Sequence, residues 1–430
     1  MKYVYILSFI IGIALFGHGK IYAQGQSSST VKPMQTSKID PIICYFTPEN
    51  MHTAVPLRAS LEQMAAGRVN GIQGATFEVA YFGFSTDRRA AFQYAVDIWA
   101  GLLTSDVTIR IQVEMSSDLG PGTLASTGWG GLNANFDNAQ RLNTWYVVSM
   151  AEKIAGKELN EITDPDISMR FNSSNDWYTG TDQATPSNQF DLVSVALHEI
   201  GHGLGFFSHT FENNGVGSYG NNVNDIPLIY TQHIEDGTGN NLVESFINNS
   251  QLLGDALTGN DLFFNSISFP SSAFPKLYAP TSFSTGSSIA HLDESTYGAG
   301  TPNSLMTPQI GFMESIHDPG FALDMLEDMG WISMKIKHDR LKDTENFSTP
   351  YMVSAIMKGD NGIENEGAKL HYSFNNFSTS ETVTMSATGN DEYAADIPSP
   401  GADGIVSYFI EVTDTDSRIF TSPGETPDFV

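Results

Sequence analysis

Hydrophobic and polar positions follow two different rhythms between residues 75 and 171. The run from Phe77 to Phe84 has the character of a strand, Val107 to Val113 alternates as a strand does, and Ile167 to Phe171 is a shorter strand-like run. Apolar residues within Ser85 to Leu103 recur at helical spacing, and Trp145 to Ala155 also predicts a helix. Because strands and helices alternate along the chain, we predict an α+β fold with a mixed sheet and covering helices.

A different pattern begins after Trp331. Turn residues separate four short strand-like runs, which are His371 to Phe374, Thr382 to Met385, Tyr393 to Ile397 and Ile405 to Val412. This spacing predicts a small all-β sandwich of the immunoglobulin or fibronectin type. We therefore expect a larger domain over residues 76–333 and the sandwich over residues 336–430, with the boundary near Met334.

The N-terminus has the pattern of a signal peptide. Met1 and Lys2 precede an apolar run from Tyr3 to Phe16, which is short for a membrane span, and a cleavage point lies at Ala23. We expect residues 1–24 to direct export, so that the protein is secreted or associated with the cell surface. A short N-terminal anchor is the alternative, and no other window approaches a membrane span.

Residues 25–75 form a leader of a different composition. Gln24 to Lys38 is rich in Gln, Ser and Thr and predicts disorder, whereas Asp40 to Gly74 is either a prosegment or an N-terminal arm packed on the first domain. Cys44 is the single cysteine of the chain, which excludes intramolecular disulfides and cysteine-rich metal sites. A thiol in a leader could cap a metal until the leader is removed, but a small buried residue is the simpler interpretation.

The amino-acid composition limits the kinds of partner that the protein can bind. The 430 residues predict two or three domains. Lys and Arg number 21 against 49 Asp and Glu, which gives a formal net charge of −28. A nucleic-acid-binding protein needs a basic face, so this balance argues against nucleic acid and against anionic lipid surfaces as partners.

His198 and His202 are the centre of the candidate chemistry. They stand four residues apart between Asp191 and His209, where an apolar stretch after a potential capping residue predicts a helix. Two imidazoles at this spacing lie on one helix face and can hold one ion. Glu199 can reach a water on that ion without binding the ion itself. This H-E-x-x-H pattern is typical of zinc hydrolases, in which zinc activates a water and a carboxylate accepts its proton and later delivers it to the leaving amine.

Three glycines, Gly201, Gly203 and Gly205, lie within and after the same motif. They are poor choices for a helix that only has to be stable. They predict a helix that packs closely around something and ends at Gly205. This pattern favours a functional histidine pair over an incidental one.

The motif H-E-x-x-H-x-x-G with a later methionine turn resembles the signature of metzincin metallopeptidases. In most of that group a third histidine stands three residues beyond the glycine, where this chain has Ser208. Leishmanolysin-like peptidases insert a long segment instead, and the order of His291 and Met306 here is similar to theirs. The resemblance covers residues 76–333 and implies a bilobed zincin fold, one zinc ion and endopeptidase activity on proteins or peptides. It also implies that His291 is the third ligand and that Met306 packs beneath the ligands.

His209 is the competing third ligand. If the helix continued through Gly205, His209 would lie about 16 Å along the axis from His198, too far for zinc–nitrogen bonds of about 2.0–2.1 Å. If the chain turns back at Gly205, Ser208 is placed to meet the metal and His209 points the opposite way. We therefore predict the set His198, His202 and His291, with His209 the less suitable ligand.

Two other functions compete with an exported zinc endopeptidase. One is a surface adhesive or binding protein with a structural zinc site, and the other is a peptidase restricted to glycoproteins. A structural site is normally closed by four protein ligands, so three candidates beside an intact Glu199 favour the enzyme. The chain lacks the many cysteines of parasite members of the leishmanolysin family, which favours a bacterial-type secreted relative. Calcium is a weaker candidate cofactor, because Asp-rich turns such as Asp360-Asn361-Gly362 match no complete calcium loop.

Overall fold

The computed structural model describes most of the chain beyond the N-terminal segment. The described residues are 32–36, 41–62, 74–220, 225–266, 268–269, 273–331, 334–338, 341–342, 344–346, 348–359, 362–375, 377–389, 391–401, 404–415 and 419–422. The chain divides into two units, Met1–Lys32 and Pro33–Val430, and the elements below all belong to the second. The predicted signal peptide, residues 1–24, lies outside the described residues, as do Asp360 and Asn361 of the candidate calcium turn.

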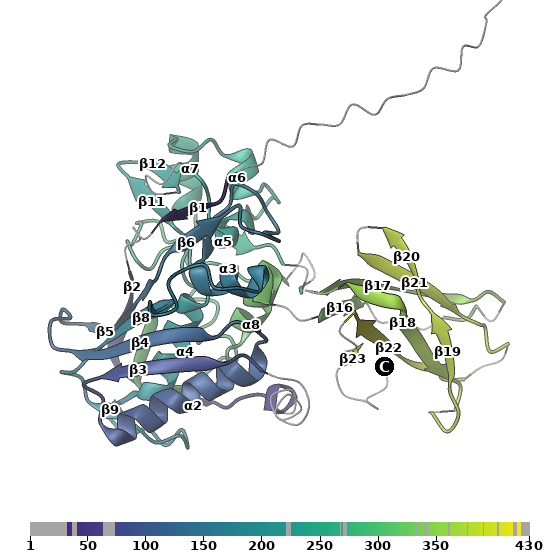
Figure 1. Ribbon diagram of the computed structural model, residues 1–430, viewed down its shortest axis with the longest axis horizontal. Coiled ribbons are helices and arrows are strands. Elements are labelled where there is room, and N and C mark those ends of the chain that lie inside the picture. The colour runs from purple at the N-terminus through teal and green to yellow at the C-terminus, as the bar shows by residue number, and fades with distance from the viewer. Residues whose placement is uncertain are drawn as a thin grey trace, which may run out of the picture. The chain divides into compact units, whose positions relative to one another are not determined.

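A six-stranded mixed sheet forms the centre of the larger part of the chain (Figure 1). Its strands are β2 Ile42–Val55, β3 Phe77–Phe82, β4 Ile109–Ser116, β5 Thr123–Trp129, β8 Ile167–Asn172 and β15 Gln309–Ile316. Their order across the sheet is β15-β2-β5-β8-β4-β3. Strands β3, β4 and β8 are parallel, β5 is antiparallel to both of its neighbours, and β15 is parallel to β2. The prediction of a mixed α+β architecture is confirmed.

The helices of this part of the chain are short with two exceptions. They are α2 Thr86–Leu102, α3 Val148–Ala155, α4 Leu192–Gly203, α5 Ile229–Gln232, α6 Leu242–Ser245, α7 Gln251–Leu257 and α8 Phe321–Leu326, followed by a π-helical turn over Glu327–Trp331. Helix α2 begins where predicted, because the Ser85 side chain accepts a hydrogen bond from the Arg88 N–H, and it buries Phe92 and Trp99 completely. This face packs against α4 and the sheet.

The predicted helix over Trp145 to Ala155 begins three residues late. Tyr146–Val147 forms strand β7, which pairs with β6, Leu132–Ala134. Helix α3 therefore begins at Val148, and its C-terminus is closed by Gly156 in the left-handed conformation. Pairing with a distant strand overrides a local helical preference here.

The N-terminal arm is part of the fold. Strand β1, Met34–Thr36, pairs with β6, so the expected disorder up to Lys38 is wrong for these three residues. Strand β2 lies inside the central sheet between β15 and β5, and Cys44 is completely buried there. The expected start of the domain at residue 76 is therefore too late. The arrangement is that of an arm packed on the domain, held by the hydrogen bonds of two neighbouring strands.

Between the end of α4 and β15 the chain builds a subdomain of small elements. Its strands form pairs rather than a continuous sheet: β11 Thr210–Asn213 with β12 Val216–Tyr219, and β13 Ile234–Asp236 with β14 Leu262–Phe264. Strands β9 Trp177–Tyr178 and β10 Phe190–Asp191 pair just before α4. The hydrophobic residues of the subdomain continue the main core.

The C-terminal region is all-β, as predicted. Two four-stranded antiparallel sheets, β16-β17-β21-β20 and β19-β18-β22-β23, share one separate core. The strands are β16 Met334–His338, β17 Tyr351–Gly359, β18 Ile363–Ser373, β19 Glu381–Thr384, β20 Ser386–Gly389, β21 Glu392–Ile397, β22 Ser407–Asp414 and β23 Ile419–Ser422. The first strand begins at Met334, where the sequence predicts the boundary.

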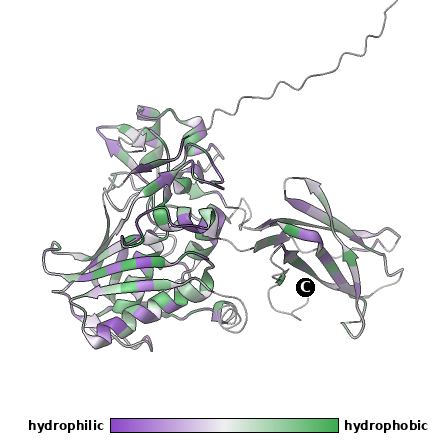
Figure 2. Cartoon of the chain, viewed as in Figure 1, coloured by the Kyte–Doolittle hydropathy of each residue, from purple (hydrophilic) through white to green (hydrophobic). Residues whose placement is uncertain are grey.

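Hydropathy follows the layers of the structure. Figure 2 shows hydrophobic and hydrophilic residues alternating along β4, as a strand with one buried face requires. Within the part of the chain that the structure describes, no helix has the length and apolar character needed to cross a membrane.

Because the two hydrophobic cores contain different residues, the C-terminal sheets should be dispensable for folding of the rest. We expect a fragment ending near Lys335 to unfold in one cooperative thermal transition, followed by circular dichroism. A fragment that is soluble but shows no transition would mean that the boundary is misplaced.

Candidate metal centre

Helix α4 carries the candidate site, and its sequence explains its position. The Asp191 side chain accepts a hydrogen bond from the Ser194 N–H at 3.0 Å and caps the helix, as predicted. Every residue from Leu192 to Gly203 is buried. A helix that is buried on all sides belongs to the core, so its polar side chains are fixed by their neighbours rather than by solvent.

The glycines of the motif are required by close packing. A Cβ on Gly203 would lie 2.5 Å from a methyl carbon of Ile167, and a Cβ on Gly201 would lie 3.0 Å from the sulfur of Met306. The helix ends at Gly203, and Gly205 follows with a positive φ of 114°, a conformation that side chains disfavour. The predicted end at Gly205 is therefore off by two residues, while the predicted close packing is present.

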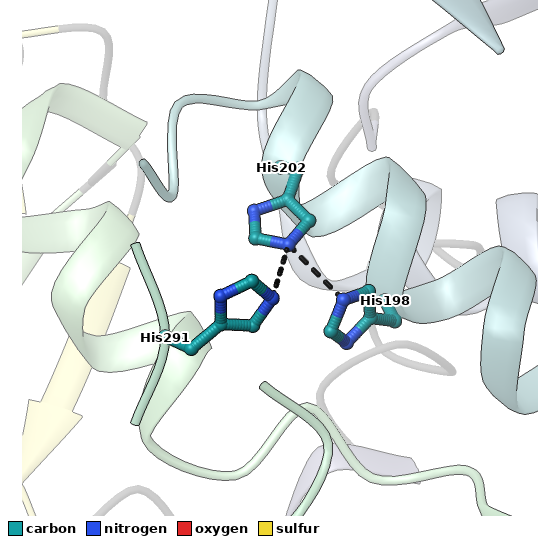
Figure 3. Close-up of side chains that lie close together, drawn as sticks. All are labelled: His198, His202 and His291. Carbon is teal, nitrogen blue, oxygen red and sulfur yellow. Dashed lines mark hydrogen bonds between the residues drawn. The ribbon is translucent and has the colours of Figure 1, made fainter. Parts of the chain in front are cut away.

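Three imidazoles meet at the end of this helix. His198 and His202 come from α4, and His291 comes from the segment that follows the inserted subdomain (Figure 3). The Nε2 atom of His202 lies 3.0 Å from that of His198 and 3.2 Å from that of His291. All three residues are completely buried. The structure thus brings together the three residues that the sequence predicts as ligands.

Backbone carbonyls fix the orientation of each ring. The Nδ1 atoms of His198, His202 and His291 lie 2.7, 2.6 and 2.9 Å from the carbonyl oxygens of Leu305, Phe206 and Ser287. A carbonyl oxygen can only accept, so each Nδ1 must carry the proton, and in a neutral ring Nε2 is then a bare lone pair. Three lone pairs directed at one point repel one another unless a cation lies between them. The donor set therefore suits one metal ion.

Burial keeps these rings neutral. It lowers the pKa of His198 to about 4 and that of His291 to about 3, and it lowers the pKa of His202 well below its ordinary value. The neighbouring imidazoles lower the pKa of His202 and His291 further, because two positive charges cannot approach so closely. Neutral imidazole is the form that binds metal ions, so the site is ready for an ion at neutral pH.

Glu199 lies beside the histidines with one oxygen held and the other available. The Thr127 hydroxyl of β5 donates to Oε2 of Glu199, whereas Oε1 is buried and has no hydrogen-bond partner among the described residues. Burial raises the pKa of Glu199 to about 8, and the hydrogen bond from Thr127 opposes that rise. A carboxyl group with such a raised proton affinity can act as a general base or acid.

Met306 lies against helix α4. It is completely buried, and its sulfur occupies the space that a side chain on Gly201 would need. Its carbonyl oxygen accepts a hydrogen bond from the Leu292 N–H at 2.8 Å, next to His291. The methionine segment therefore supports two of the three histidines at once, because the preceding residue, Leu305, also holds the ring of His198.

His209 and Ser208 lie elsewhere. The ring of His209 packs against Phe207 and Phe211, and the Ser208 hydroxyl lies 3.1 Å from that of Thr231. His209 belongs to no cluster of potential metal ligands among the described residues. The structure thus places His291, and not His209, beside His198 and His202.

Cys44 is buried, as the simpler interpretation predicts, but it is also close to the site. Its sulfur, a ring nitrogen of His198 and a carboxylate oxygen of Glu199 lie within 4.8 Å of one another. Burial, together with the negative charges of Glu199 and Glu314, raises the pKa of the thiol well above its ordinary value. The thiol is therefore protonated unless a metal ion binds it.

Four side chains that hold α4 escape prediction from the sequence. Each donates a hydrogen bond to a backbone carbonyl of the helix or of its end. Trp99 donates to the carbonyl of Leu197, Trp129 to that of His202, Ser149 to that of Gly203 and Trp331 to that of Leu204. Thr127 is a fifth residue of this kind. These donors come from α2, β5, α3 and the end of the domain, so no local pattern marks them.

Comparison with known proteins adds little about chemistry. A family model described as SPBPB7E8-like matches residues 134–276, less than half of the chain. The matched region contains α4 with its two histidines and ends before His291. No curated protein matches the chain.

The two candidate third ligands can be separated by mutation. His291→Ala should lower the affinity for zinc by several orders of magnitude, because it removes one of three imidazoles at the point where they meet. His209→Ala should leave the affinity within a few-fold of the wild type. Titration with zinc in competition with a chromophoric chelator measures both, and the opposite ranking would mean that His209 is the ligand.

Proposed function

We propose that this protein is an exported zinc metalloendopeptidase of the leishmanolysin-like type. The observation that carries the proposal is the geometry of the three imidazoles. A tetrahedral ion with zinc–nitrogen bonds of about 2.0–2.1 Å separates neighbouring nitrogens by about 3.3–3.4 Å. The two Nε2 separations of 3.0 and 3.2 Å are close to this value. Three protein ligands leave a fourth position for water or substrate, as in catalytic zinc sites.

The chain's own residues supply the remaining chemistry. A zinc ion at this position would supply Lewis acidity toward a water molecule and a peptide carbonyl. Glu199 then accepts the water proton at Oε1, the oxygen without a partner among the described residues, and delivers it to the leaving amine. Burial of Glu199 and the histidines excludes bulk water from the proton transfer and strengthens every electrostatic interaction in the site.

The architecture is compatible with this family. The proposal of a bilobed zincin fold of the metzincin type is supported by a mixed sheet, a helix bearing the two histidines, and a third histidine and a methionine from a later segment. The two antiparallel C-terminal sheets support the proposal of an accessory sandwich of the immunoglobulin or fibronectin type. The apolar segment at the N-terminus supports export, and protein or peptide chains are the proposed substrates.

A structural zinc site in a binding protein is the second candidate, and the position of Cys44 favours it. A thiolate beside His198 could close the site as a fourth protein ligand. The buried carboxylate of Glu199 supports the enzyme instead, because a closed structural site has no use for a general base there. A peptidase restricted to glycoproteins would share the same centre.

Glu199→Gln should separate metal binding from catalysis. The variant should keep its zinc, because Glu199 is not a ligand, and should lose about 10²–10⁴ in kcat because it loses the proton acceptor. Casein or a fluorogenic peptide serves as substrate, with zinc content measured on the same samples. Glu152→Gln is the matched control, since Glu152 is equally buried and lies in α3. A fully active, zinc-loaded Glu199→Gln protein would refute the assignment.

Cys44→Ala distinguishes the open site from the closed one. If three histidines hold the ion, the variant should bind zinc within a few-fold of the wild type and keep peptidase activity. Loss of packing should cost only about 1 kcal/mol of unfolding free energy, measured by urea denaturation. Loss of tight zinc binding would instead favour a structural site that Cys44 completes.

A further inference from the structure

We propose that Thr127 is a positioning residue for Glu199, which holds one carboxylate oxygen so that the other is presented to the water. The inference rests on the proposed function, in which Glu199 is the general base. Thr127 lies 72 positions before Glu199 in the sequence, on strand β5 of the central sheet.

The two carboxylate oxygens of Glu199 differ in their hydrogen bonding. The Thr127 hydroxyl donates to Oε2, and the backbone carbonyl of Glu199 lies 3.1 Å from the same hydroxyl as a second acceptor. Oε1 has no partner among the described residues. Thr127 and Glu199 are both completely buried, so a water molecule from bulk solvent does not compete for Oε2.

The central sheet fixes the position of the Thr127 hydroxyl. Thr127 lies opposite Ile42 of β2 on one side and Met169 of β8 on the other, so hydrogen-bonded strands flank it. Two residues along the same strand, and therefore on the same face, Trp129 donates to the carbonyl of His202 at 3.0 Å. Strand β5 thus contacts α4 at two points that bracket the metal-binding turn.

The hydrogen bond from the Thr127 hydroxyl fixes the orientation of the Glu199 carboxylate. A terminal carboxylate rotates within a broad and shallow energy well, so the hydrogen bond to Oε2 selects one rotation. Proton transfer requires the accepting oxygen within hydrogen-bond reach of the water, and misplacement by about 1 Å can cost about 100-fold in rate. Thr127 thereby acts on the rate of proton transfer through Glu199, without contacting the metal or the substrate.

A structural role for Thr127 is the competing explanation. In that case the hydroxyl only ties α4 to β5 through the backbone carbonyl of Glu199, and its loss would lower stability and zinc binding along with activity. Thr127→Val keeps the shape and removes the hydroxyl, whereas Thr127→Ser keeps the hydroxyl. Thr144→Val is a matched control, because the Thr144 side chain is also buried and donates to a backbone carbonyl, that of Leu142.

The experiment measures kcat, KM and zinc content of the zinc-loaded full chain with a fluorogenic peptide. For Thr127→Val we expect kcat to fall about 10- to 100-fold, with KM and zinc content within about twofold of the wild type. Thr127→Ser should recover kcat to within a few-fold, and Thr144→Val should match the wild type. An unchanged kcat in Thr127→Val, equal losses in the valine and serine variants, or a loss that parallels the loss of zinc would each overturn the proposal.

Crystal structures of the two Thr127 variants give a readout that does not depend on activity. The Glu199 carboxylate should be rotated or disordered in Thr127→Val and should keep its orientation in Thr127→Ser. An unchanged carboxylate in Thr127→Val overturns the positioning role. Full activity of Glu199→Gln, measured in parallel, would refute the proposed function instead, so the two failures are distinguishable.

Discussion

Three buried imidazoles that share one point are the constraint on which the rest of this structure depends. Each Nδ1 proton is taken by a backbone carbonyl, so the three Nε2 lone pairs converge at separations of 3.0 and 3.2 Å. Burial lowers the pKa of each ring, so protonation cannot relieve the repulsion at neutral pH. A cation at the centre would relieve this repulsion, so in our proposal metal binding stabilises the folded site.

Holding this arrangement requires a helix that propensity alone would not form well. Two glycines inside α4 cost about 2 kcal/mol relative to alanine, yet both are needed for close approach of Met306 and Ile167. The surrounding structure compensates through donors from several elements that bind the helix carbonyls, three of them tryptophan N–H groups. The same framework supports the chemistry, since β5 carries both Trp129 and Thr127. In our account, rigidity of α4 and orientation of Glu199 have a common origin.

Features that depend on residues close together in the sequence could be predicted, whereas contacts between distant segments could not. The cap at Asp191, the helix of the histidine pair and the all-β character of the C-terminal region follow from residue types at short spacing. Strand β2 was not predictable within the sheet, because its partners β5 and β15 lie far along the chain and set its place. Helix and strand geometry argued against His209, but only a family resemblance pointed to His291 as the third ligand. Thr127 carried no signal, because one threonine in a strand looks like any other.

The central claim is that one zinc ion binds where the three Nε2 atoms meet. Anomalous X-ray diffraction at the zinc absorption edge, from crystals of the zinc-loaded full chain, tests it most directly. We predict one strong peak about 2.0–2.1 Å from Nε2 of His198, His202 and His291, and no peak at His209. A site that stays empty under saturating zinc, or a peak whose ligands exclude His291, would contradict the account.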